Sequence, residues 1–527
     1  MEHFEVFLAA LFVSVAGLNV LARRLDVPYP IPLVIGGLVL GLLPGMPEIE
    51  LNPDLVLLVF LPPLLYGAAF FSDLRALRTY ARAISLSAIG LVLLTTGSVA
   101  VVAHEVMGLP WAVAFALGAI VSPTDPVAAT AIMRRVGAPR RIVNVIEGEA
   151  LVNDATALVA YRVAVAAAVG GSFSAVEAGL EFLLAAFGGV AVGLAVAYVI
   201  GEIRRRLEDP VTEITISLLT AYAAFIPADE LGLSGVLASV TAGLYLGWKA
   251  PELISPQTRL QALGTWEVLT FLLNATLFIL VGLQLPVIAD GLADVPTSEV
   301  IGYSALVCAA VIGTRYLWLF TTPYLIRLLD RREAQRQLRV GWQERFVYGW
   351  SGMRGAVSLA AALALPLETD AGAPLPDRDL ILFITFSLIF VTVVGQGLTL
   401  PALIRRLGVV EDGSEEETEE LRARLYATRA ALDRLDQLEE EGWTNNDSVE
   451  RARGIYRFRE RRFKTRAGKL DDEGIEEQSL TWQRMMHDVY NAQRQELIRL
   501  RNEGEISSDV MRRLERELDL EESRLEV

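Results

Sequence analysis

Cysteine and histidine are almost absent from this chain. Its 527 residues contain one cysteine, Cys308, and three histidines. A single cysteine excludes an intrachain disulfide framework and any multi-cysteine metal site, and we interpret Cys308 as a packing residue. His104 and His487 have no metal-ligand partner at helical spacing, so we assign no metal role to them. A cleavable leader is not expected either, because acidic residues precede the first hydrophobic run; this run should remain as a helix.

The sequence also lacks the constellations typical of enzymes and nucleotide-binding proteins. No nucleophile, base and orienting acid stand at a recognisable spacing, and the hydrophobic runs contain no paired histidines. The segment Gly36-Gly-Leu-Val-Leu-Gly41 is entirely apolar and no Lys-Ser/Thr follows it, so we interpret it as helix packing and not as a phosphate loop. No cofactor and no nucleic-acid partner are predicted.

Apolar residues, in contrast, are abundant. Hydrophobic residues make up 53% of the chain and the mean hydropathy is +0.41, well above the values of soluble proteins. The formal net charge is −16, but residues 411–527 alone contain 31 acidic and 21 basic residues. Most of the negative charge therefore belongs to the tail, and the remainder of the chain is predicted to lie in a lipid bilayer.

Hydrophobic runs close to the ~20 residues that cross a bilayer recur from Phe4 to Leu400. We count about thirteen of them and therefore predict an all-α polytopic membrane protein. The runs lie at approximately 4–22, 29–45, 54–72, 83–103, 111–134, 142–169, 176–201, 211–228, 232–248, 266–286, 299–326, 345–367 and 379–403.

The positive residues between these runs alternate. Arg and Lys collect in the loops that follow odd-numbered runs, whereas the loops after even-numbered runs hold essentially only Arg378. Positive charge near helix ends is retained in the cytoplasm, so this alternation predicts an odd number of spans. The N-terminus is expected outside and the C-terminus in the cytoplasm of a multi-pass protein of the inner (plasma) membrane.

Two of the runs, the fifth and the twelfth, are interrupted in mid-membrane. The fifth contains Ser122-Pro-Thr-Asp-Pro126, and the twelfth contains Gly349-Trp-Ser-Gly-Met-Arg-Gly355. Proline removes a backbone donor and clashes with the preceding turn, so the carbonyls near Ala119 and Ser122 are expected to be available to a cation. Broken, crossing helices in corresponding halves indicate inverted repeats around a transport site. A simple proline kink or a glycine packing contact is the alternative interpretation.

The sixth run carries Glu149, Asn153 and Asp154, where a spanning helix normally tolerates no charge. An ionisable side chain at the bilayer centre costs about 2.5–3.5 kcal/mol, so such residues usually face a wet cavity and carry ions or protons. Asp154 lies roughly 18 Å along the run, near the midplane. Glu149 is about 140° away around the helix axis, so the two carboxylates should differ in surroundings and role. Arg354, on the facing broken helix, is the predicted partner of Glu149.

Two further arginines lie within predicted spans. Arg162 follows Asp154 on the outer side and could either line an exit path or extend to the interface, and we favour the second. Arg315 lies near the middle of the eleventh run, and the sequence indicates no partner for it.

The chain resembles the bacterial Na+/H+ antiporters of the monovalent cation:proton antiporter family 1, the NhaP type, which is related to animal Na+/H+ exchangers. The resemblance covers roughly residues 5–405. It rests, besides the Ser-Pro-Thr-Asp-Pro break, on Glu147-Gly-Glu149-Ala-Leu-Val-Asn153-Asp154, Leu61-Pro-Pro-Leu-Leu, Leu273-Asn-Ala-Thr-Leu-Phe-Ile-Leu-Val-Gly-Leu-Gln284 and Gly352-Met-Arg354-Gly-Ala-Val.

This resemblance implies roles for the site residues. Asp154 would alternately hold a proton and a cation, and Asn153 would stabilise the helix that carries it. Thr124 and Asp125 would belong to the extended crossing, with Thr124 supplying an oxygen to the Na+ held at Asp154.

The resemblance also implies that Glu149 and Arg354 form a structural ion pair at the site and that the protein is a homodimer. Two positions depart from the family pattern. Many relatives have serine where this chain has Ala150, and an acidic residue where it has Gly67. Fewer protein oxygens are therefore expected around the ion.

The predicted function is secondary active exchange of a monovalent cation, foremost Na+, for H+. Both ions would compete for Asp154 while the site gains access to each face of the membrane in turn. The resemblance suggests that electrogenic relatives carry a second aspartate at the position of Asn153, so asparagine there implies electroneutral one-for-one exchange. K+ or Li+ would fit the same oxygen chemistry, so a K+/H+ antiporter is one alternative and an uncoupled cation channel is another.

The chain changes character after Arg406. We predict a transmembrane antiporter domain at 1–406, an acidic linker at 407–420 that cannot bury enough apolar surface to fold, and a cytoplasmic helical domain at 421–527. Leucines at helical spacing stop before Gly442, and Asn446-Asp-Ser and Ser507-Ser-Asp offer caps for later helices. A basic run over residues 457–466 could contact anionic lipid or the linker, but a solvated helix face is the favoured interpretation.

Overall fold

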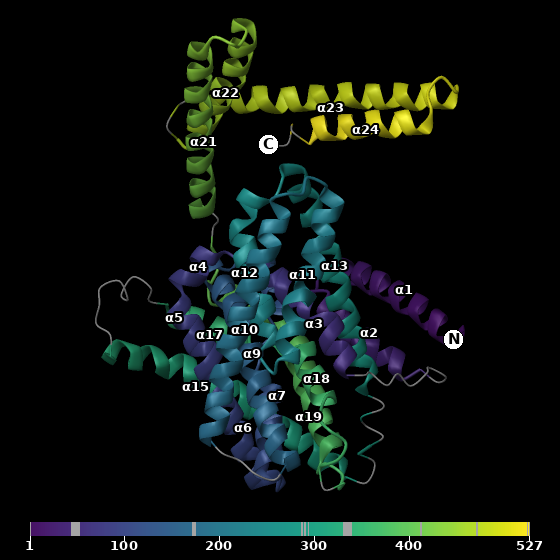
Figure 1. Ribbon diagram of the computed structural model, residues 1–527, viewed down its shortest axis with the longest axis vertical. Helices are drawn as coiled ribbons and strands as arrows, with labels where there is room; N and C mark the ends of the chain where they lie inside the picture. The colour runs from purple at the N-terminus through teal and green to yellow at the C-terminus, as the bar shows by residue number, and fades with distance from the viewer. Residues whose placement is uncertain are drawn as a thin grey trace. The chain divides into compact units, whose positions relative to one another are not determined.

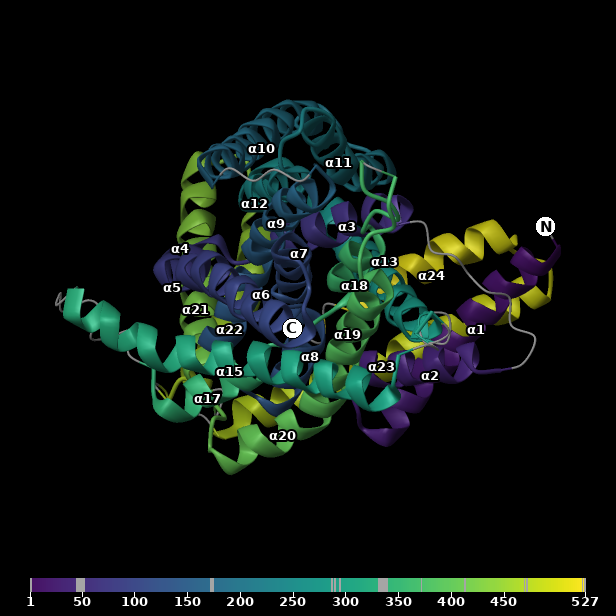
Figure 2. The ribbon, with the colours of Figure 1, turned by 90° about the horizontal axis from the view of Figure 1, so that it is seen from below.

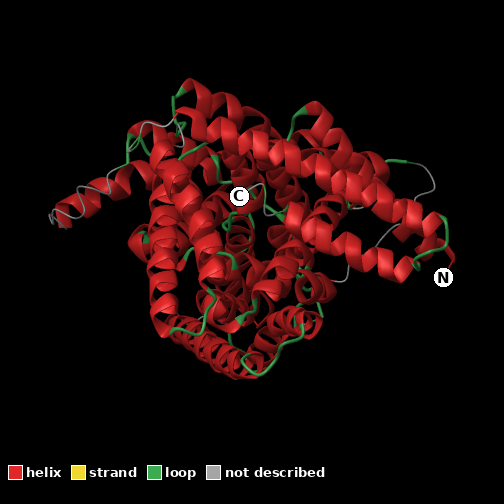
Figure 3. Cartoon of the chain, turned by 90° about the horizontal axis from the view of Figure 1, so that it is seen from above, coloured by secondary structure: helices red, strands yellow, loops and turns green. Residues whose placement is uncertain are grey.

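The computed structural model describes residues 2–43, 53–170, 175–285, 288, 291–292, 295–329, 340–370, 372–411, 414–468, 470, 473–523 and 525. Helices form the regular structure of these residues (Figure 1), and Figure 3 shows no strand among them. The prediction of an all-α chain is confirmed. The chain divides into two compact units, Met1–Glu411 and Asp412–Val527, and each is described by itself.

Each predicted apolar run coincides with one helix or one interrupted helix of the first unit. Eight helices of the described residues are long and apolar enough to cross a membrane, and Pro30–Gly41 and Leu58–Phe70 are shorter apolar helices. Residues 44–45 of the second run and 286 of the tenth lie outside the described residues. The chain is thus a multi-pass membrane protein, whereas the count of about thirteen spans stays a prediction.

One group of helices, here called the flanking bundle, packs mainly within itself. A Cβ at Gly37 or Gly282 would meet a backbone carbonyl of the other helix of the α2–α13 pair, and one at Gly193 of α10 would meet a carbonyl of α12. Only glycine permits such close backbone approach. The bundle comprises α1 (Glu2–Leu25), α2 (Pro30–Gly41), α3 (Pro53–Phe70), α10 (Ala175–Arg204), α11 (Pro210–Glu230), α12 (Gly235–Leu253) and α13 (Pro256–Leu283).

A second group, here called the crossing bundle, contains both interrupted helices. Figure 2 shows α15 lying along α6, in agreement with their contacts. A short helix, α4 (Leu74–Thr79), leads from the flanking bundle into it. The crossing bundle comprises α5 (Ala81–Ser85), η1 (Leu86–Leu91), α6 (Val92–Met107), α7 (Trp111–Val121), α8 (Pro126–Val136), α9 (Arg140–Gly170), α15 (Thr297–Leu329), α17 (Trp342–Trp350), α18 (Ala356–Leu363), α19 (Arg378–Phe390), η2 (Val391–Gln396) and α20 (Gly397–Arg406).

The two bundles meet mainly where α9 and α18 face α3, α10, α12 and α13. Among the described glycines, Gly397 of the crossing bundle faces the flanking bundle, and a Cβ there would meet the side chain of Ile31 and no backbone.

The break between α7 and α8 has a local cause. Asp125 caps α8, since its side chain accepts a hydrogen bond from the Val127 backbone N at 2.9 Å, and Pro126 takes the first helical position, where no N–H is needed. The Ala119 carbonyl, predicted to be free, instead accepts from the Ser122 backbone N at 3.4 Å and from Ser122 Oγ at 2.9 Å. That prediction was wrong, because a serine at the end of a helix can satisfy the exposed carbonyl itself.

The second unit consists of two helical pairs, α21 (Ser414–Glu441) with α22 (Asn446–Arg466) and α23 (Glu473–Asn502) with α24 (Ser508–Glu522). Helix α21 begins inside the predicted linker 407–420, because glutamate is a good helix former and its charge is favourable near a helix N-terminus. Asn445, one residue before the predicted cap, caps α22, and Ser507 caps α24. Residues 412–413 of the linker lie outside the described residues.

Candidate ion-binding site

Helix α9 carries the polar residues of the site into the protein interior. Glu149, Asn153 and Asp154 expose only 2%, 1% and 9% of their surface. Apolar neighbours on the same helix, such as Leu151 and Ala155, are buried against α3 and α12. The helix is therefore held by its apolar face, and its polar groups must find partners or a cavity inside the protein.

The two interrupted helices touch at their breaks. The backbone N of Asp125 donates to the carbonyl of Met353 at 2.8 Å, and Arg354 Nε donates to the carbonyl of Val121 at 3.2 Å. Gly355 leaves the room that the Asp125 carboxylate occupies, because a Cβ at this position would overlap it. The predicted crossing is thus present in the described residues.

Glu149 forms its ion pair with Arg315 of α15 and not with Arg354, so the predicted pairing was wrong. Arg315 Nη1 lies 2.7 Å from Glu149 Oε1, and Nη2 lies 3.3 Å from Oε2. The Tyr348 hydroxyl also donates to Glu149, and the Arg315 guanidinium stacks over the Tyr348 ring, 4.9 Å from its centre. The sequence places Arg315 in mid-span without a partner, because the rotation of α15 against α9 is a tertiary property.

Arg354 forms its hydrogen bonds mainly with backbone carbonyls at the two breaks. Its guanidinium donates to the carbonyls of Val121 and Gly352, and its backbone N donates to Thr392 Oγ1 at 3.0 Å. The side chain is 2% exposed. Arg354 therefore satisfies carbonyls that the interruption of two helices leaves without helical donors.

Thr124 is held by two side chains of α9. Its hydroxyl donates to Glu149 Oε1 at 3.2 Å and lies 2.8 Å from Asn153 Nδ2, which donates to it. Asn153 Nδ2 also lies 3.4 Å from the Thr124 carbonyl. Arg315, Glu149, Thr124 and Asn153 form one continuous network, which fixes the break beside Asp154.

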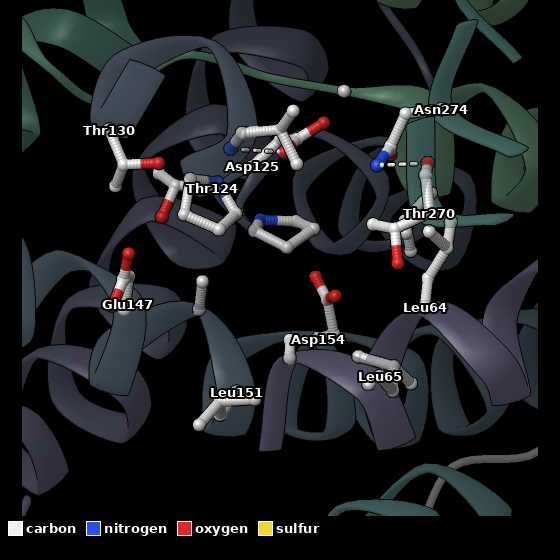
Figure 4. Close-up of a pocket in the computed structure, with 18 of the residues that line it drawn as sticks. Leu64, Leu65, Thr124, Asp125, Thr130, Glu147, Leu151, Asp154, Thr270 and Asn274 are labelled. Atoms are coloured by element: carbon white, nitrogen blue, oxygen red, sulfur yellow. Dashed lines mark hydrogen bonds between the residues drawn. The ribbon is translucent and has the colours of Figure 1, made fainter. Parts of the chain in front are cut away.

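Asp154 faces a cavity of about 300 Å³ that Thr124 and Asp125 also line (Figure 4). Within the described part of the chain, its carboxylate has no hydrogen bond or ion pair. Ala150 and Gly67, the two positions that depart from the family pattern, line the same cavity and contribute no side-chain oxygen. Asp154 is thus a buried carboxylate whose only free side is the cavity.

The mouth of this cavity is polar. Arg134 and Glu147 line it and form an ion pair at 2.6 Å, with 67% and 27% of their side chains exposed. Ser72 also lies on the lining. The cavity that Asp154 lines is therefore bordered by an exposed ion pair on the face where Arg134 lies.

A second cavity, of about 310 Å³, lies between α3, α9, α11 and α12. Leu61 lines both cavities and separates them. Arg162 of α9 forms an ion pair with Asp229 of α11 on its lining, so this arginine joins the two bundles and does not merely extend towards the interface.

The described residues contain no group of three or more His, Cys, Asp or Glu side chains able to hold a metal ion. The predicted Na+ ligands Asp154 and Thr124 do line one cavity, but the Thr124 hydroxyl already takes part in two hydrogen bonds. A cation entering this cavity would meet carboxylate, hydroxyl and amide oxygens, the ligands that hard cations prefer.

Comparisons with known proteins point to one family. Residues 8–406 match the family described as "Sodium/hydrogen exchanger, transmembrane". The chain is 36% identical over 526 residues to an uncharacterized Na+/H+ exchanger of Mycobacterium tuberculosis, covering 99% of this chain and 96% of the relative. It is 32% identical over 415 residues to the "Sodium, potassium, lithium and rubidium/H(+) antiporter" of Bacillus subtilis, covering 76% and 62%.

The fold also resembles a solved structure. The sodium proton antiporter MjNhaP1 from Methanocaldococcus jannaschii superposes with a TM-score of 0.59 at 20% identity, over 78% of this chain and 100% of that one.

Proposed function

Because this chain belongs to the sodium/hydrogen exchanger family, we propose that it is a secondary active antiporter that exchanges a monovalent cation, foremost Na+, for H+. One observation carries the proposal. Asp154 is 9% exposed, has no partner within the described residues, and lines a cavity that reaches one face of the protein. A bare carboxylate at membrane depth is costly, so it should hold either a proton or a cation whenever the site is closed to water.

Competition between a proton and a cation for one carboxylate would couple the transport of the two ions. A proton and a monovalent cation neutralise Asp154 equally, and neither can be carried while the other is bound. The other charges near the site are fixed: Glu149 is paired with Arg315, and the Asp125 carboxylate caps α8, where a helix N-terminus favours negative charge. Only Asp154 is then free to change its occupant, which supports electroneutral one-for-one exchange.

Movement of the site is proposed to follow the division into bundles. Asp154, Thr124 and Asp125 belong to the crossing bundle, which meets the flanking bundle through side chains. A shift of the crossing bundle would close the cavity on one face and open it on the other. The outside N-terminus, the cytoplasmic C-terminus, the plasma-membrane location and a homodimer remain part of this proposal.

The test is proton movement in sealed proteoliposomes with an imposed pH gradient and separate additions of Na+, K+ and Li+. Valinomycin holds the membrane voltage near zero in the Na+ and Li+ runs. We expect collapse of the gradient that depends on the added cation and persists without a voltage. The relative from Bacillus subtilis is named for sodium, potassium, lithium and rubidium, so the ranking of the ions decides between Na+/H+ and K+/H+ exchange.

Asp154→Asn keeps the shape of the side chain and removes its charge, so it should abolish exchange while the protein still folds. Asp488→Asn, at an exposed carboxylate of α23, is the matched control and should exchange normally. Normal exchange by Asp154→Asn would contradict the role of this residue. Tracer-cation flux without proton movement would instead favour an uncoupled cation channel.

A further inference from the structure

The crossing bundle supplies only part of the oxygens that line the site. Of its polar lining residues, Thr124 already makes two side-chain hydrogen bonds, Asp125 Oδ1 accepts one from Val127, and Glu147 is paired with Arg134. Thr130 and Ser358 add one hydroxyl each to the lining. Ala150 offers no oxygen. Hard cations take about six oxygen ligands, and Asp154 alone supplies two. The remaining ligands come from water, from these two hydroxyls or from the opposite wall.

The opposite wall is formed by α13 of the flanking bundle. Thr270 and Asn274, one helical turn apart and therefore on one face, line the same cavity as Asp154. Figure 4 shows both residues across the cavity from Asp154, on the other side of the space that the side chains enclose. Gly67 of α3 lies next to Thr270, since a Cβ at Gly67 would lie at an ordinary contact distance of 3.8 Å from Thr270 Oγ1.

The Asn274 amide is oriented by its own helix. Nδ2 donates to the Thr270 backbone carbonyl at 2.9 Å, and only the NH₂ end of an amide can donate to a carbonyl. This hydrogen bond leaves Oδ1 as the remaining polar atom, and it has no partner within the described residues. Asn274 is 6% exposed, so a buried acceptor is held beside the cavity without a protein donor. Thr270 Oγ1 likewise has no hydrogen bond there.

We propose that Thr270 and Asn274 are cation ligands supplied by the flanking bundle, and that they set the affinity of the site for the cation when the cavity opens on the Arg134 face. This inference rests on the proposed exchange function. The proton on Asp154 needs neither oxygen, so the two residues act on the cation alone. Because Asp154 moves with the crossing bundle and α13 does not, the shift that opens the opposite face separates the cation from these ligands.

The affinity for the cation therefore differs between the two faces. A cation that binds from the Arg134 face has the oxygens of both bundles, whereas one at the opposite face has those of the crossing bundle and water. Loss of one ligand to a charged group corresponds to about tenfold in affinity.

The test compares Thr270→Val and Asn274→Leu with the wild type in right-side-out and inside-out proteoliposomes. Valine preserves the shape of threonine without the hydroxyl, and leucine keeps the branching of asparagine at Cγ without the amide. We expect the KM for Na+ at the Arg134 face to rise about tenfold in each variant, to rise much less at the opposite face, and to change more than kcat.

Thr265→Val is the matched control. Thr265 lies on the same helix, is exposed, and bonds only the Gln261 carbonyl of its own helix. The KM of Thr265→Val for Na+ should equal that of the wild type. Asn274→Asp provides a second, charge-adding variant and should lower the KM for Na+ at the Arg134 face.

An unchanged KM in both Thr270→Val and Asn274→Leu, with a wild type that exchanges, would overturn the inference and leave the proposed function intact. An equal rise at both faces would also overturn it, because that result is expected of a general loss of structure. A wild type that does not exchange any cation for protons would instead contradict the proposed function itself.

Discussion

Replacing Arg315 by methionine removes the cation that faces Glu149 and leaves the carboxylate buried without a partner. Both side chains are 2% exposed, and two N–O contacts at 2.7 and 3.3 Å join them. Breaking a buried pair by removing one partner costs about 3–5 kcal/mol, because the remaining charge is uncompensated. For a unit of this size we expect a fall of about 3–10 °C in apparent Tm. Thermal unfolding of the detergent-solubilised protein, followed by intrinsic fluorescence, measures it.

A double-mutant cycle separates the partner from its neighbour. Arg315→Met leaves the Glu149 carboxylate without a partner, and Glu149→Gln removes that charge. The loss in free energy of unfolding in the double variant should therefore be smaller than the sum of the two single losses, by up to about 3 kcal/mol. The same cycle with Arg354→Met should show a smaller coupling, because Arg354 bonds the carbonyls of Val121 and Gly352. A larger coupling of Glu149 to Arg354 than to Arg315 would refute the reasoning.

Three further predictions follow from other contacts. Gly355→Ala places a Cβ on the carboxylate that caps α8, so we expect exchange in proteoliposomes to fall by about tenfold or more, the scale of 1.4 kcal/mol. Cysteines at Arg162 and Asp229, which join α9 to α11, should be linked by a cleavable bifunctional thiol reagent about as long as an arginine side chain, and exchange should stop until the link is cleaved. In the tail, the hydrogen bond from Arg494 lowers the pKa of Glu522. This hydrogen bond should therefore stabilise the α23–α24 pair at pH values above the ordinary glutamate pKa. The stabilisation should be lost as pH falls through the lowered pKa of Glu522. Hydrogen exchange of the full-length protein measures this loss.

Each of these predictions has a matched control. Gly313→Ala adds the same methyl group where no atom lies within 4 Å, and should exchange as the wild type does. The single cysteine variants at the α9–α11 pair should stay active in the same reagent. For the tail, Arg494→Gln should remove the pH-dependent part of protection between pH 3 and 5, about the range of an ordinary carboxyl group. Equal pH dependence in that variant would contradict the role of the ion pair.

The sequence predicted the features that depend on local properties. The apolar runs, the breaks at Pro126 and Gly355 and the unusual position of Asp154 all follow from residue types and spacing, and the helices have the expected places. The Glu149 partner could not be predicted in this way. Arg315 and Arg354 both lie in apolar runs, and only the rotation of α15 against α9 decides which one reaches the carboxylate.

Other differences arise where side chains compensate locally. Ser122 satisfies the carbonyl that the proline break exposes, so a missing backbone donor did not leave a free oxygen. The opposite wall of the cavity was also not predicted, because Thr270 and Asn274 lie on a long apolar helix far from Asp154 in the chain. A polar pair spaced by one helical turn in such a helix was the available signal.

The close glycine approaches within the flanking bundle bear on how this sequence can diverge over evolutionary time. At Gly37 or Gly282 an added side chain would overlap a backbone carbonyl that no rotamer change can move, so a mutation there should prevent assembly of the bundle. Where the bundles meet through side chains, as Gly397 meets Ile31, a substitution can be absorbed by a neighbour. We therefore expect substitutions that adapt the turnover rate to a new salinity or temperature at the interface between the bundles. The glycine contacts within the flanking bundle should remain unchanged.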